Sequence, residues 1–408
     1  MARNRKNYKN RNKNKTNPNK RKKTSGNVFI PKFYWKENLG LAGRYAGVLE
    51  INTNGWGFIR KLDYEFSFSP QDPFLKPEEV KELDLRPGLI LEGEFEEDKR
   101  GNKHVFNIDR INRKPVEAWT KASRFERQIP IMPTEWIRLG DRADNIEMRV
   151  IDLVAPVGKG QRALIVAPPR TGKTVMLKQI ANSITESHPD IHLSILLVDE
   201  RPEEVTDFIR SSKAEVFASS NDRKTQSHIR ITELALGYAK RKAEMGEDAV
   251  LLIDSLTRLS RAYNAVQTTS GRTLSGGLDI RALEIPKKIF GSARKIEGGG
   301  SLTIIATCLV ETNSRMDDLI FEEFKGTGNM ELVLDRELAN DRIYPAINIT
   351  ASGTRNEEKF ITDSLEERNM VRRYLLKKSP RESMLGLLKV LQNTDSNEEL
   401  LNQIAASV

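Results

Sequence analysis

The feature that most constrains this chain is a short apolar run leading into a loop that ends in Gly172, Lys173 and Thr174. Run and loop read Ala163-Leu-Ile-Val-Ala-Pro-Pro-Arg-Thr-Gly-Lys-Thr174. A strand that breaks into a tight loop and restarts as a helix points backbone N–H groups at one spot, where they hold an anion. We expect a nucleotide phosphate there, with Lys173 on the β- and γ-phosphates and Thr174 on Mg²⁺. An ordinary strand-to-helix turn is the alternative, because Ala167 replaces the first glycine of the G-x-x-x-x-G-K-[ST] pattern.

The sequence from Met148 onward predicts an α/β domain. Near-continuous Val, Ile and Leu runs alternate there with helical segments, which indicates a parallel sheet covered on both faces. The predicted strands are 162–167, 191–198, 215–218, 249–253, 302–309, 331–334 and 346–349, and helices are predicted to begin at Lys173, Glu203, Thr225 and Asp279. Residues 364–401 are also helical in pattern. The only cysteine, Cys308, falls in a predicted strand, so we expect a buried thiol and no disulfide.

Two predicted strands end in carboxylates. Asp254 closes one run and is expected to join the Mg²⁺ shell, and Glu200 closes another and is expected to polarise the attacking water. Because ligands lie at the carboxyl ends of parallel strands, both acids should converge on Lys173. Each acid alone could instead cap a helix. The four histidines lack ligand spacing, so the sequence predicts no metal site beyond the nucleotide's Mg²⁺.

The basic character of the chain is concentrated in a tail. The 408 residues, enough for two or three domains, carry a net charge of +9, but residues 1–23 hold eleven Lys or Arg and no acid. Residues 1–26 contain little that could be buried, so we expect a disordered tail that binds nucleic-acid phosphates or only aids solubility. No apolar run reaches about 18 residues and no signal peptide is evident, which predicts a cytoplasmic protein without membrane contact.

Residues 45–112, after a short connector at 27–44, predict a small antiparallel barrel of the OB or cold-shock type. Short alternating segments are separated there by turn-forming residues. Within it, the run Gly55, Trp56, Gly57, Phe58, Ile59 and Arg60 places two aromatics on one strand face, with glycines that let bases approach. Base stacking on such aromatics is worth about 1–3 kcal/mol per base, so we expect a site for single-stranded RNA. The alternative is that both aromatics belong to the core.

Residues 113–147 are expected to be a linker, so that the α/β domain occupies 148–408. Two loops in that domain carry a single cation among small residues, Arg272 in 268–277 and Arg315 in 311–316. Such loops suit a moving grip on backbone phosphates, although surface connections are equally compatible with the sequence.

Taken together, these motifs resemble the bacterial transcription termination factor Rho family. The resemblance rests on the segments 167–174, 199–205, 254–264, 324–331 and 352–355 and runs from about Gly47 to the C-terminus. It implies a RecA-like ATPase domain and a homohexameric ring with ATP between subunits. It further implies a 5′ to 3′ RNA-DNA helicase that threads nascent, pyrimidine-rich RNA through the ring and acts on the RNA polymerase elongation complex. The implied cofactors are ATP and Mg²⁺.

The resemblance also assigns roles to individual residues. Glu200 would be the catalytic carboxylate, Arg201 would contact the γ-phosphate, Arg355 would be an arginine finger for the neighbouring subunit, Arg342 a second interface arginine and Tyr344 an aromatic near the adenine. The expected ATP-binding set is Gly158, Lys159, Gly160, Gln161, Arg162, Ala163, Arg170, Thr171, Gly172, Lys173, Thr174, Val175, Arg201 and Tyr344. The expected RNA-binding set is Gly55, Trp56, Gly57, Phe58, Ile59, Arg60, Asp72, Phe74, Lys103, Arg272, Arg315 and Lys325.

Three departures from the family pattern stand out. No N-terminal helical subdomain is visible before the barrel, Arg170 and Arg272 replace expected lysines, and residues 102–105 offer no clear counterpart to an expected aromatic in the RNA site. Two rival hypotheses remain at this point. One is a RecA-like motor with another task, such as a rotary or secretion ATPase, and the other is an RNA-binding protein whose ATPase site has decayed.

Overall fold

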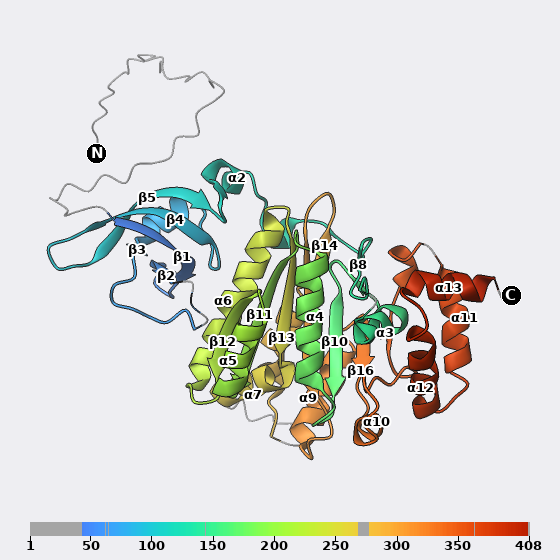
Figure 1. Cartoon of the computed structure of the whole chain (residues 1–408). Coiled ribbons are helices and arrows are strands. Elements are labelled where there is room, and N and C mark those ends of the chain that lie inside the picture. Colours follow the sequence, from blue (N-terminus) through green and yellow to red (C-terminus); the bar gives the residue numbers. More distant parts are fainter. Residues whose placement is uncertain are drawn as a thin grey trace, which may run out of the picture.

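The structure is a computed structural model that describes residues 43–61, 63, 65–142, 144–267, 277–362 and 364–406. Figure 1 shows a small barrel at one end, a large sheet with its helices in the centre, and a cluster of helices at the C-terminal end. The predicted tail at 1–26, nearly all of the predicted connector, and Arg272 lie outside the described residues. Within the described residues no helix is long and apolar enough to span a membrane.

The barrel is closed by five strands. They are β1 (Gly43–Ile51), β2 (Gly57–Arg60), β3 (Phe74–Leu75), β4 (Ile90–Glu97) and β5 (Lys103–Ile111), with α1 (Pro77–Glu82) between β3 and β4. β1 pairs with β2 and β4, β2 with β3, and β4 with β5, all antiparallel, and a single parallel pair, Phe74 with His104, joins β3 to β5. Because alternate residues of each strand point inward, Leu49, Ile59 and Leu91 are buried in one apolar core. The prediction of an OB-type barrel is confirmed.

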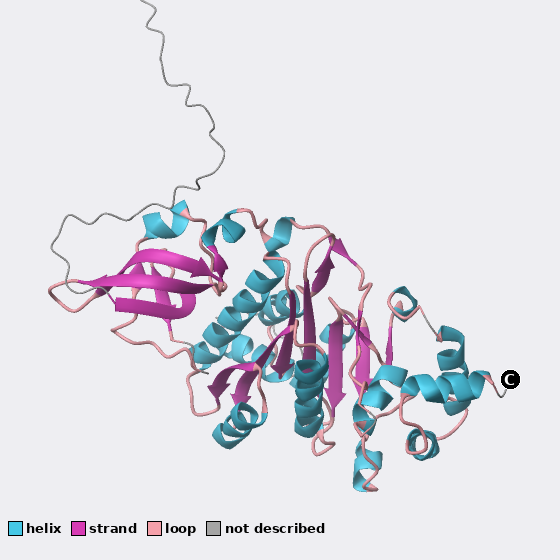
Figure 2. Cartoon of the chain, turned by 45° about the horizontal axis from the view of Figure 1, so that its top comes forward, coloured by secondary structure: helices cyan, strands magenta, loops and turns pink. Residues whose placement is uncertain are grey.

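The α/β domain is built on a mostly parallel sheet. Its strands follow the order β12 (Glu215–Ser220), β11 (His192–Glu200), β13 (Asp248–Asp254), β15 (Ser301–Leu309), β10 (Arg162–Ala167), β16 (Met330–Val333) and β17 (Gly353–Thr354). Only the last pair on this path is antiparallel. Helices cover both faces of the sheet, as Figure 2 shows, and each face buries its own apolar cluster.

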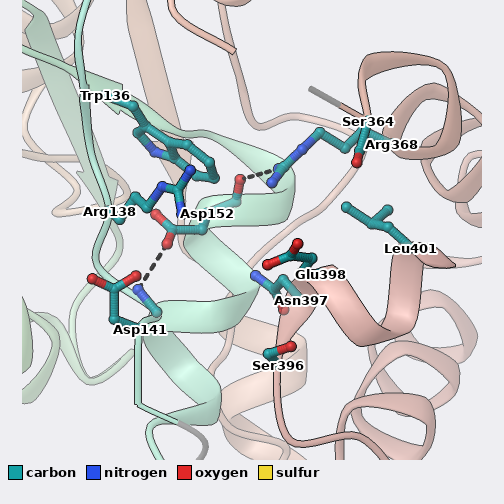
Figure 3. A pocket seen from close by; sticks show the side chains of 11 residues that line it. Trp136, Arg138, Asp141, Asp152, Ser364, Arg368, Ser396, Asn397, Glu398 and Leu401 are labelled. Carbon is teal, nitrogen blue, oxygen red and sulfur yellow. Dashed lines mark hydrogen bonds between the residues drawn. The ribbon is translucent and has the colours of Figure 1, made fainter. Parts of the chain in front are cut away.

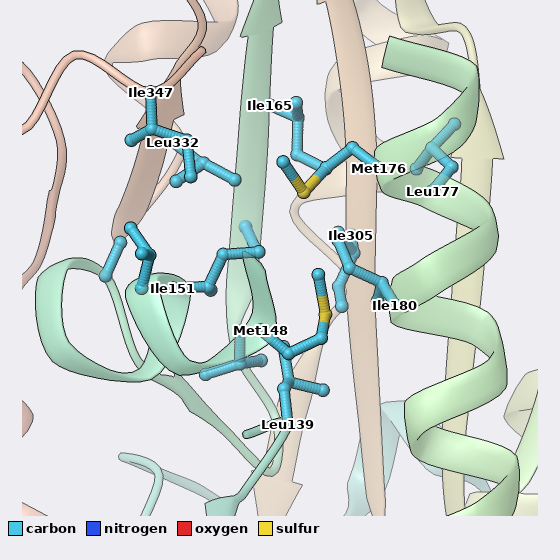
Figure 4. Packing of buried hydrophobic residues seen from close by; sticks show 14 of the residues in the cluster. Leu139, Met148, Ile151, Ile165, Met176, Leu177, Ile180, Ile305, Leu332 and Ile347 are labelled. Atoms are coloured by element: carbon cyan, nitrogen blue, oxygen red, sulfur yellow. The ribbon is translucent and has the colours of Figure 1, made fainter. Parts of the chain in front are cut away.

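One face of the sheet packs against α3 (Ile146–Val154), α4 (Lys173–Ser187), α5 (Pro202–Ser211) and α10 (Arg336–Asn340). Met148 from α3, Ile165 from β10 and Met176 from α4 meet there (Figure 4). The other face packs against α6 (Thr225–Glu244), α7 (Leu256–Val266), α8 (Glu284–Phe290) and α9 (Arg315–Lys325). Cys308 is buried in this second cluster, as predicted.

Three helices complete the C-terminal region: α11 (Leu365–Leu375), α12 (Pro380–Leu391) and α13 (Asn397–Ala405). Arg149 of α3 ties them to the sheet. It is fully buried, and its guanidinium group donates to the carbonyl oxygens of Leu391 and Thr394 at 3.0 and 2.7 Å. These bonds satisfy a buried cation without a carboxylate and fix the helical region against the same core.

The barrel is docked on α6. Val48 and Ile90 of the barrel share an apolar cluster with Ile231 and Tyr238 of that helix. Gly88, at φ +91°, leaves space for the close approach, since a Cβ atom there would sit 2.2 Å from the Tyr238 backbone nitrogen. The barrel and the α/β domain therefore meet in packed contact.

The segment predicted as a linker, 113–147, contains short regular elements: β6 (Lys114–Pro115), α2 (Val116–Thr120), η1 (Phe125–Arg127), β7 (Pro130–Ile131) and β8 (Trp136–Ile137). β7 joins the large sheet through β14 (Arg294–Ile296), and β8 pairs with β9 (Val157–Gly158). The chain between the two domains is thus held along the α/β domain rather than spanning open space.

Two sequence predictions of elements were wrong. Residues 346–349 form no strand and make only an isolated bridge between Leu334 and Ile347, because Asn348 turns the chain by accepting the N–H of Ala351 with its side chain. The helix predicted from Asp279 is a 3-10 turn, η2 (Ile280–Leu283), and α8 begins only at Glu284. Asp279 caps that turn by accepting the N–H of Arg281.

Candidate functional site

The loop between β10 and α4 has the backbone of a phosphate cradle. Gly172 precedes α4 with φ +90°, a left-handed conformation that favours glycine, and Thr171 donates its hydroxyl to the Pro168 carbonyl at 2.8 Å. The first N–H groups of α4 are therefore free to receive an anion. Tyr344 lies beside this loop, since a Cβ atom on Gly172 would sit 3.7 Å from its ring, and its side chain is 45% exposed. Val175, in the first turn of α4, is exposed as well.

The two strand-end acids converge on Lys173, as predicted from the sequence. β11 and β13 are parallel neighbours, so Glu200 and Asp254 end at the same edge of the sheet. The Lys173 Nζ atom pairs with the Asp254 carboxylate and lies 3.6 Å from Glu200 Oε1. Asp254 also accepts the Thr307 hydroxyl at 2.7 Å. A lysine, two buried carboxylates and a phosphate cradle thus form one compact site.

The environment of Glu200 suits proton transfer near neutral pH. Burial and, to a smaller extent, the charge of Asp254 raise the pKa of its carboxyl to about 7, although Lys173 and Arg258 oppose the rise. A general base works best when its pKa lies near the operating pH. Glu200 therefore has the protonation behaviour expected of the group that takes a proton from an attacking water.

Arg258 and Asp199 also belong to this site, although sequence reasoning gave them no role. Arg258 Nε lies 3.2 Å from Glu200 Oε1, and its Nη1 donates to Asp199 Oδ2 at 3.1 Å. His228 of α6 stands behind them, with Nε2 3.9 Å from Asp199 Oδ1 and Nδ1 2.8 Å from the Ser219 hydroxyl. Arg258 follows Asp254 by four residues in the sequence, and this spacing was the only sequence feature that could have indicated its place in the site.

Six residues expected to bind ATP are not brought to this loop. Gly158, Lys159, Gly160, Gln161, Arg162 and Ala163 lie at the amino end of β10, and six strand residues span about 17 Å. They have structural partners there: Lys159 pairs with Glu135 and Asp248, and the Gln161 side chain donates to Asn329. Within one chain, these six residues therefore do not reach the phosphate loop, because the loop lies at the opposite end of the strand.

Three predicted catalytic arginines lie at the surface. Arg355 directly follows β17, and its N–H donates to the Asn329 carbonyl at 2.9 Å, at the amino edge of the sheet and so on the side away from Lys173. Arg342 is exposed at φ +60°, and Arg201 is exposed and pairs with Glu204 at 3.7 Å. Arg170 is also exposed, at φ +68°. Among the described residues, no carboxylate lies within 4.0 Å of Arg355, Arg342 or Arg170.

The barrel carries a cluster of half-buried rings. The Phe74 ring is central, with ring-centroid distances of 5.5 Å to Trp56, 6.5 Å to Phe58 and 4.2 Å to His104. His104 is the residue that sequence reasoning missed, because its contact with Phe74 forms only when β3 meets β5. Bases of a single strand stack on such rings with little regard to sequence. Lys103 lies over another ring of the barrel, with Nζ 5.0 Å from the Phe95 ring centroid.

Several other predicted RNA contacts have a structural position instead. Gly57 faces the barrel interior, where a Cβ atom would sit 2.9 Å from the Leu49 side chain, and Gly55 occupies a turn at φ +84°. Gly57 therefore does not open the strand to bases. Ile59 is core. Arg60 and Asp72 are buried and pair with each other at 2.7 Å, so their side chains are not presented to a ligand.

The remaining predicted cations lie on one helix. Arg315 and Lys325 are exposed at the first and last positions of α9, which an eleven-residue helix separates by about 15 Å. The two side chains are therefore separated by the length of the helix. Arg272, predicted to grip RNA, lies outside the described residues.

Oxygen donors suited to Mg²⁺ are present beside the phosphate cradle. The Thr174 hydroxyl and the Asp254 carboxylate are the hard ligands that this ion prefers, together with nucleotide phosphates. The described part of the chain has no group of three or more His, Cys, Asp or Glu side chains that could hold a metal ion by itself. The donor set therefore fits an ion that arrives with a nucleotide.

A phosphate cradle with paired carboxylates, on a parallel sheet joined to a barrel with clustered rings, defines a phosphate-loop ATPase that carries an RNA-binding domain. Residues 147–354 match the family model of the ATP synthase alpha/beta family, nucleotide-binding domain. Residues 45–117 match the model of the Rho termination factor, RNA-binding domain. The chain is 48% identical to transcription termination factor Rho of Thermotoga maritima, over 88% of this chain and 84% of the relative. Against that of Neisseria gonorrhoeae it is 45% identical over 87% of each. The chain belongs to the transcription termination factor Rho family.

Solved structures confirm the fold. An ATPase from the type III secretion system of pathogenic bacteria superposes with a TM-score of 0.56 at 24% identity, over 69% of this chain and 86% of that chain. The assembled ATPase EscN from enteropathogenic E. coli gives 0.54 at the same identity, over 70% and 73%. At this identity the likeness shows a shared α/β fold and no shared task.

Proposed function

We propose that this protein is an RNA-dependent ATPase that moves along nascent single-stranded RNA as a helicase and terminates transcription. One observation carries the proposal: a single chain holds both the core of a hydrolytic site, with Lys173 in contact with Glu200 and Asp254, and a cluster of tilted rings on an RNA-binding barrel. Membership of the Rho family supports the same function. The rival hypothesis of an RNA-binding protein with a decayed ATPase site does not account for the retention of all three side chains close to one another.

In the proposed reaction, Lys173 leaves the Asp254 carboxylate and contacts the β- and γ-phosphates when ATP enters. Thr174 and Asp254 would then hold Mg²⁺, which neutralises charge on the phosphate oxygens when bound. Glu200 accepts a proton from the attacking water, and Arg258 orients Glu200 through the contact described above. Tyr344 would pack against the adenine, a role supported by its position beside the glycine that precedes α4.

We further propose that the working form is a homohexameric ring with ATP between subunits. Arg355 supports this arrangement, since it lies at the sheet edge opposite its own Lys173 and could reach an ATP only on a neighbouring subunit. An arginine that meets the transferred phosphate in trans stabilises the charge of the transition state. Arg342 and Arg201, both exposed, are proposed to lie at the same interface.

The partners follow from the task. Pyrimidine-rich RNA is the proposed ligand of the barrel, the RNA polymerase elongation complex is the proposed target, and the cytoplasm is the proposed location. Arg315 and Lys325 are proposed to contact the RNA backbone, each from its own end of α9. Arg272 is proposed to belong to a second RNA contact.

The test is ATP hydrolysis by the full chain with and without a cytidine-rich single-stranded RNA, with Glu200→Gln as the control. Strong stimulation by RNA that the control abolishes, together with unwinding of an RNA-DNA hybrid, is expected. An ATP hydrolysis rate that does not depend on RNA would contradict the proposal. It would favour a secretion-type motor, whose fold this α/β domain shares.

A further inference from the structure

A polar cavity lies between the segment after β8, helix α3 and the starts of α11 and α13. Its volume is about 270 Å³, and none of its lining residues belongs to the phosphate loop or to the ring cluster of the barrel. Figure 3 shows side chains from all four segments directed into it. The ATPase and RNA sites do not account for this cavity.

Two arginines meet there around one indole ring. The Cζ atom of Arg368 lies 4.7 Å from the centroid of the Trp136 ring, and the Cζ atom of Arg138 lies 5.0 Å from it. Contact between a guanidinium group and an aromatic ring holds the cation in a defined place. Each positive group is therefore held against the indole ring before any ligand arrives.

Neither guanidinium group has a carboxylate within 4.0 Å among the described residues. Arg368 donates to the backbone oxygen of Asp152 at 2.9 Å, while the Asp152 carboxylate accepts the N–H groups of Leu139 and Gly140. Burial lowers the pKa of Arg368. The charges of Asp152 and Glu357 oppose this decrease, and the charge of Arg138 adds to it. Arg368 is thus a partly buried cation with a second cation nearby, and a bound anion would offset the desolvation and repulsion of its charge.

The surrounding elements add to the attraction for an anion. α11 and α13 both begin at this cavity, and the partial positive charge of a helix start favours negative groups. The Ser364 side chain makes no capping bond to α11. Asp141, Asp152 and Glu398 also line the cavity and oppose an anion. The Asp141 and Glu398 side chains are exposed, so solvent and salt screen them. Burial raises the pKa of the Asp152 carboxyl to about 7, which reduces its negative charge near neutral pH.

We propose that this cavity binds a small phosphate-type oxyanion, inorganic phosphate or pyrophosphate, between Arg138 and Arg368. The planar guanidinium group presents paired donors that match phosphate oxygens, and the volume suits a compact anion rather than a whole nucleotide. The bound anion would clamp α11 to the segment after β8. Arg372 of the same helix donates to the Ser352 carbonyl, three residues before Arg355, so the anion would steady the segment that carries that arginine.

The test is equilibrium dialysis of the full chain carrying Lys173→Ala, so that the phosphate loop does not contribute. Radiolabelled phosphate and pyrophosphate are used in separate arms at constant ionic strength, which identifies the preferred anion. Saturable binding of one equivalent per chain is expected in at least one arm. Adding Arg368→Gln or Arg138→Gln should weaken it at least about tenfold, whereas Arg373→Gln, an exposed cation on α11, should leave it unchanged.

Absence of saturable binding in both arms would overturn the proposal. Equal weakening by Arg373→Gln would also overturn it, because the anion would then respond only to general positive charge. If Arg368→Gln reduces the helical circular dichroism of the protein, Arg138→Gln decides the question, since the Arg138 side chain is exposed and its removal leaves the packing of α11 intact.

Discussion

Glu50 of the barrel is bound by Arg230 of α6 through two hydrogen bonds. Arg230 Nε donates to Oε1 at 2.6 Å and Nη2 to Oε2 at 2.8 Å. Arg60, at the end of strand β2, donates to the same carboxylate at 2.5 Å. One carboxylate therefore joins the strand that follows Trp56 to the helix that carries His228, which stands behind the hydrolytic site.

Replacing this carboxylate should loosen the barrel from the α/β domain. Burial alone would raise the pKa of Glu50, but the hydrogen bonds and charges of Arg230 and Arg60 lower it below 4.5. Because the folded-state pKa is depressed, the stabilisation is present above the ordinary pKa and is lost as pH falls through the depressed value. Glu50→Gln should lower the unfolding free energy by about 1–3 kcal/mol at pH 7, measured by urea unfolding. The deficit should shrink towards acid pH.

Arg44→Gln is the matched control for this measurement. Arg44 also pairs with two carboxylates, but its side chain is 69% exposed, so its loss should change stability by less than about 1 kcal/mol. If the two substitutions lower the free energy of unfolding equally, the position of Glu50 between the domains does not contribute extra stability.

Removal of single rings should separate RNA binding from catalysis. Trp56→Ala and His104→Ala should each weaken binding of single-stranded RNA by about 1–3 kcal/mol, the worth of a stacked base, in a fluorescence anisotropy titration. Basal hydrolysis of ATP should persist. Tyr374→Ala removes an exposed ring from the C-terminal helices and should not alter affinity. Full affinity in His104→Ala would restrict the RNA surface to the rings on β2 and β3.

The acid limb of the pH profile should belong to Glu200. Because burial raises its pKa to about 7, the carboxyl is protonated at pH 6 and cannot accept a proton, so kcat/KM for ATP should rise between about pH 6 and 8. Glu200→Gln should remove nearly all activity at every pH. Glu357→Gln is the control, because burial also raises the pKa of Glu357. This variant is expected to keep the acid limb of the profile. Disappearance of the limb in Glu357→Gln would show that a group other than Glu200 is responsible for it.

Arg355 should act on a neighbouring subunit. Arg355→Ala alone should lower the hydrolysis rate about 10³-fold, as loss of an arginine finger does, with ATP binding retained. Mixing Arg355→Ala subunits with Glu200→Gln subunits should restore part of the activity, because some interfaces then pair an intact Glu200 with an intact Arg355. No recovery in mixed rings would mean that both residues serve the same subunit. Arg373→Ala subunits are the control for the mixing procedure.

The basic tail should contribute to RNA binding through charge alone. Deletion of residues 2–26 removes all eleven cations at the N-terminus, so RNA affinity should fall and its dependence on salt concentration should become less steep. Hydrolysis at saturating RNA should be unchanged. A salt slope equal to that of the full chain would show that the tail does not touch the RNA.

The part of the fold that could be predicted from sequence is the part set by local periodicity. The strands that end at Ala167, Glu200 and Asp254 are long apolar runs, and their acids converge because parallel strands end at one edge of a sheet. The segment at 346–349 was mistaken for a strand because a short apolar run does not reveal the turn that the Asn348 side chain makes.

The unpredicted parts of the site depend on contacts between distant segments. Arg258 is recognised as a site residue only because it meets Asp199, 59 positions earlier in the chain. Arg60 looked like an RNA contact because it follows two aromatics, yet Asp72 and Glu50 close over it in the fold. Gly57 looked like an opening for bases, but the alternation of β2 turns it toward Leu49.

The seam of the barrel has a consequence for how RNA would be sensed. β3 and β5 are joined through one residue pair, Phe74 and His104, and the same two rings are in tilted contact in the ring cluster, with their centroids 4.2 Å apart. A base that packs on these rings would therefore also stabilise the single strand pairing that closes the barrel between β3 and β5. Backbone amides along the β3–β5 pairing should exchange with deuterium slowly when RNA is bound and faster when RNA dissociates. The local opening rate of this one strand pair would therefore report whether the barrel is occupied by RNA.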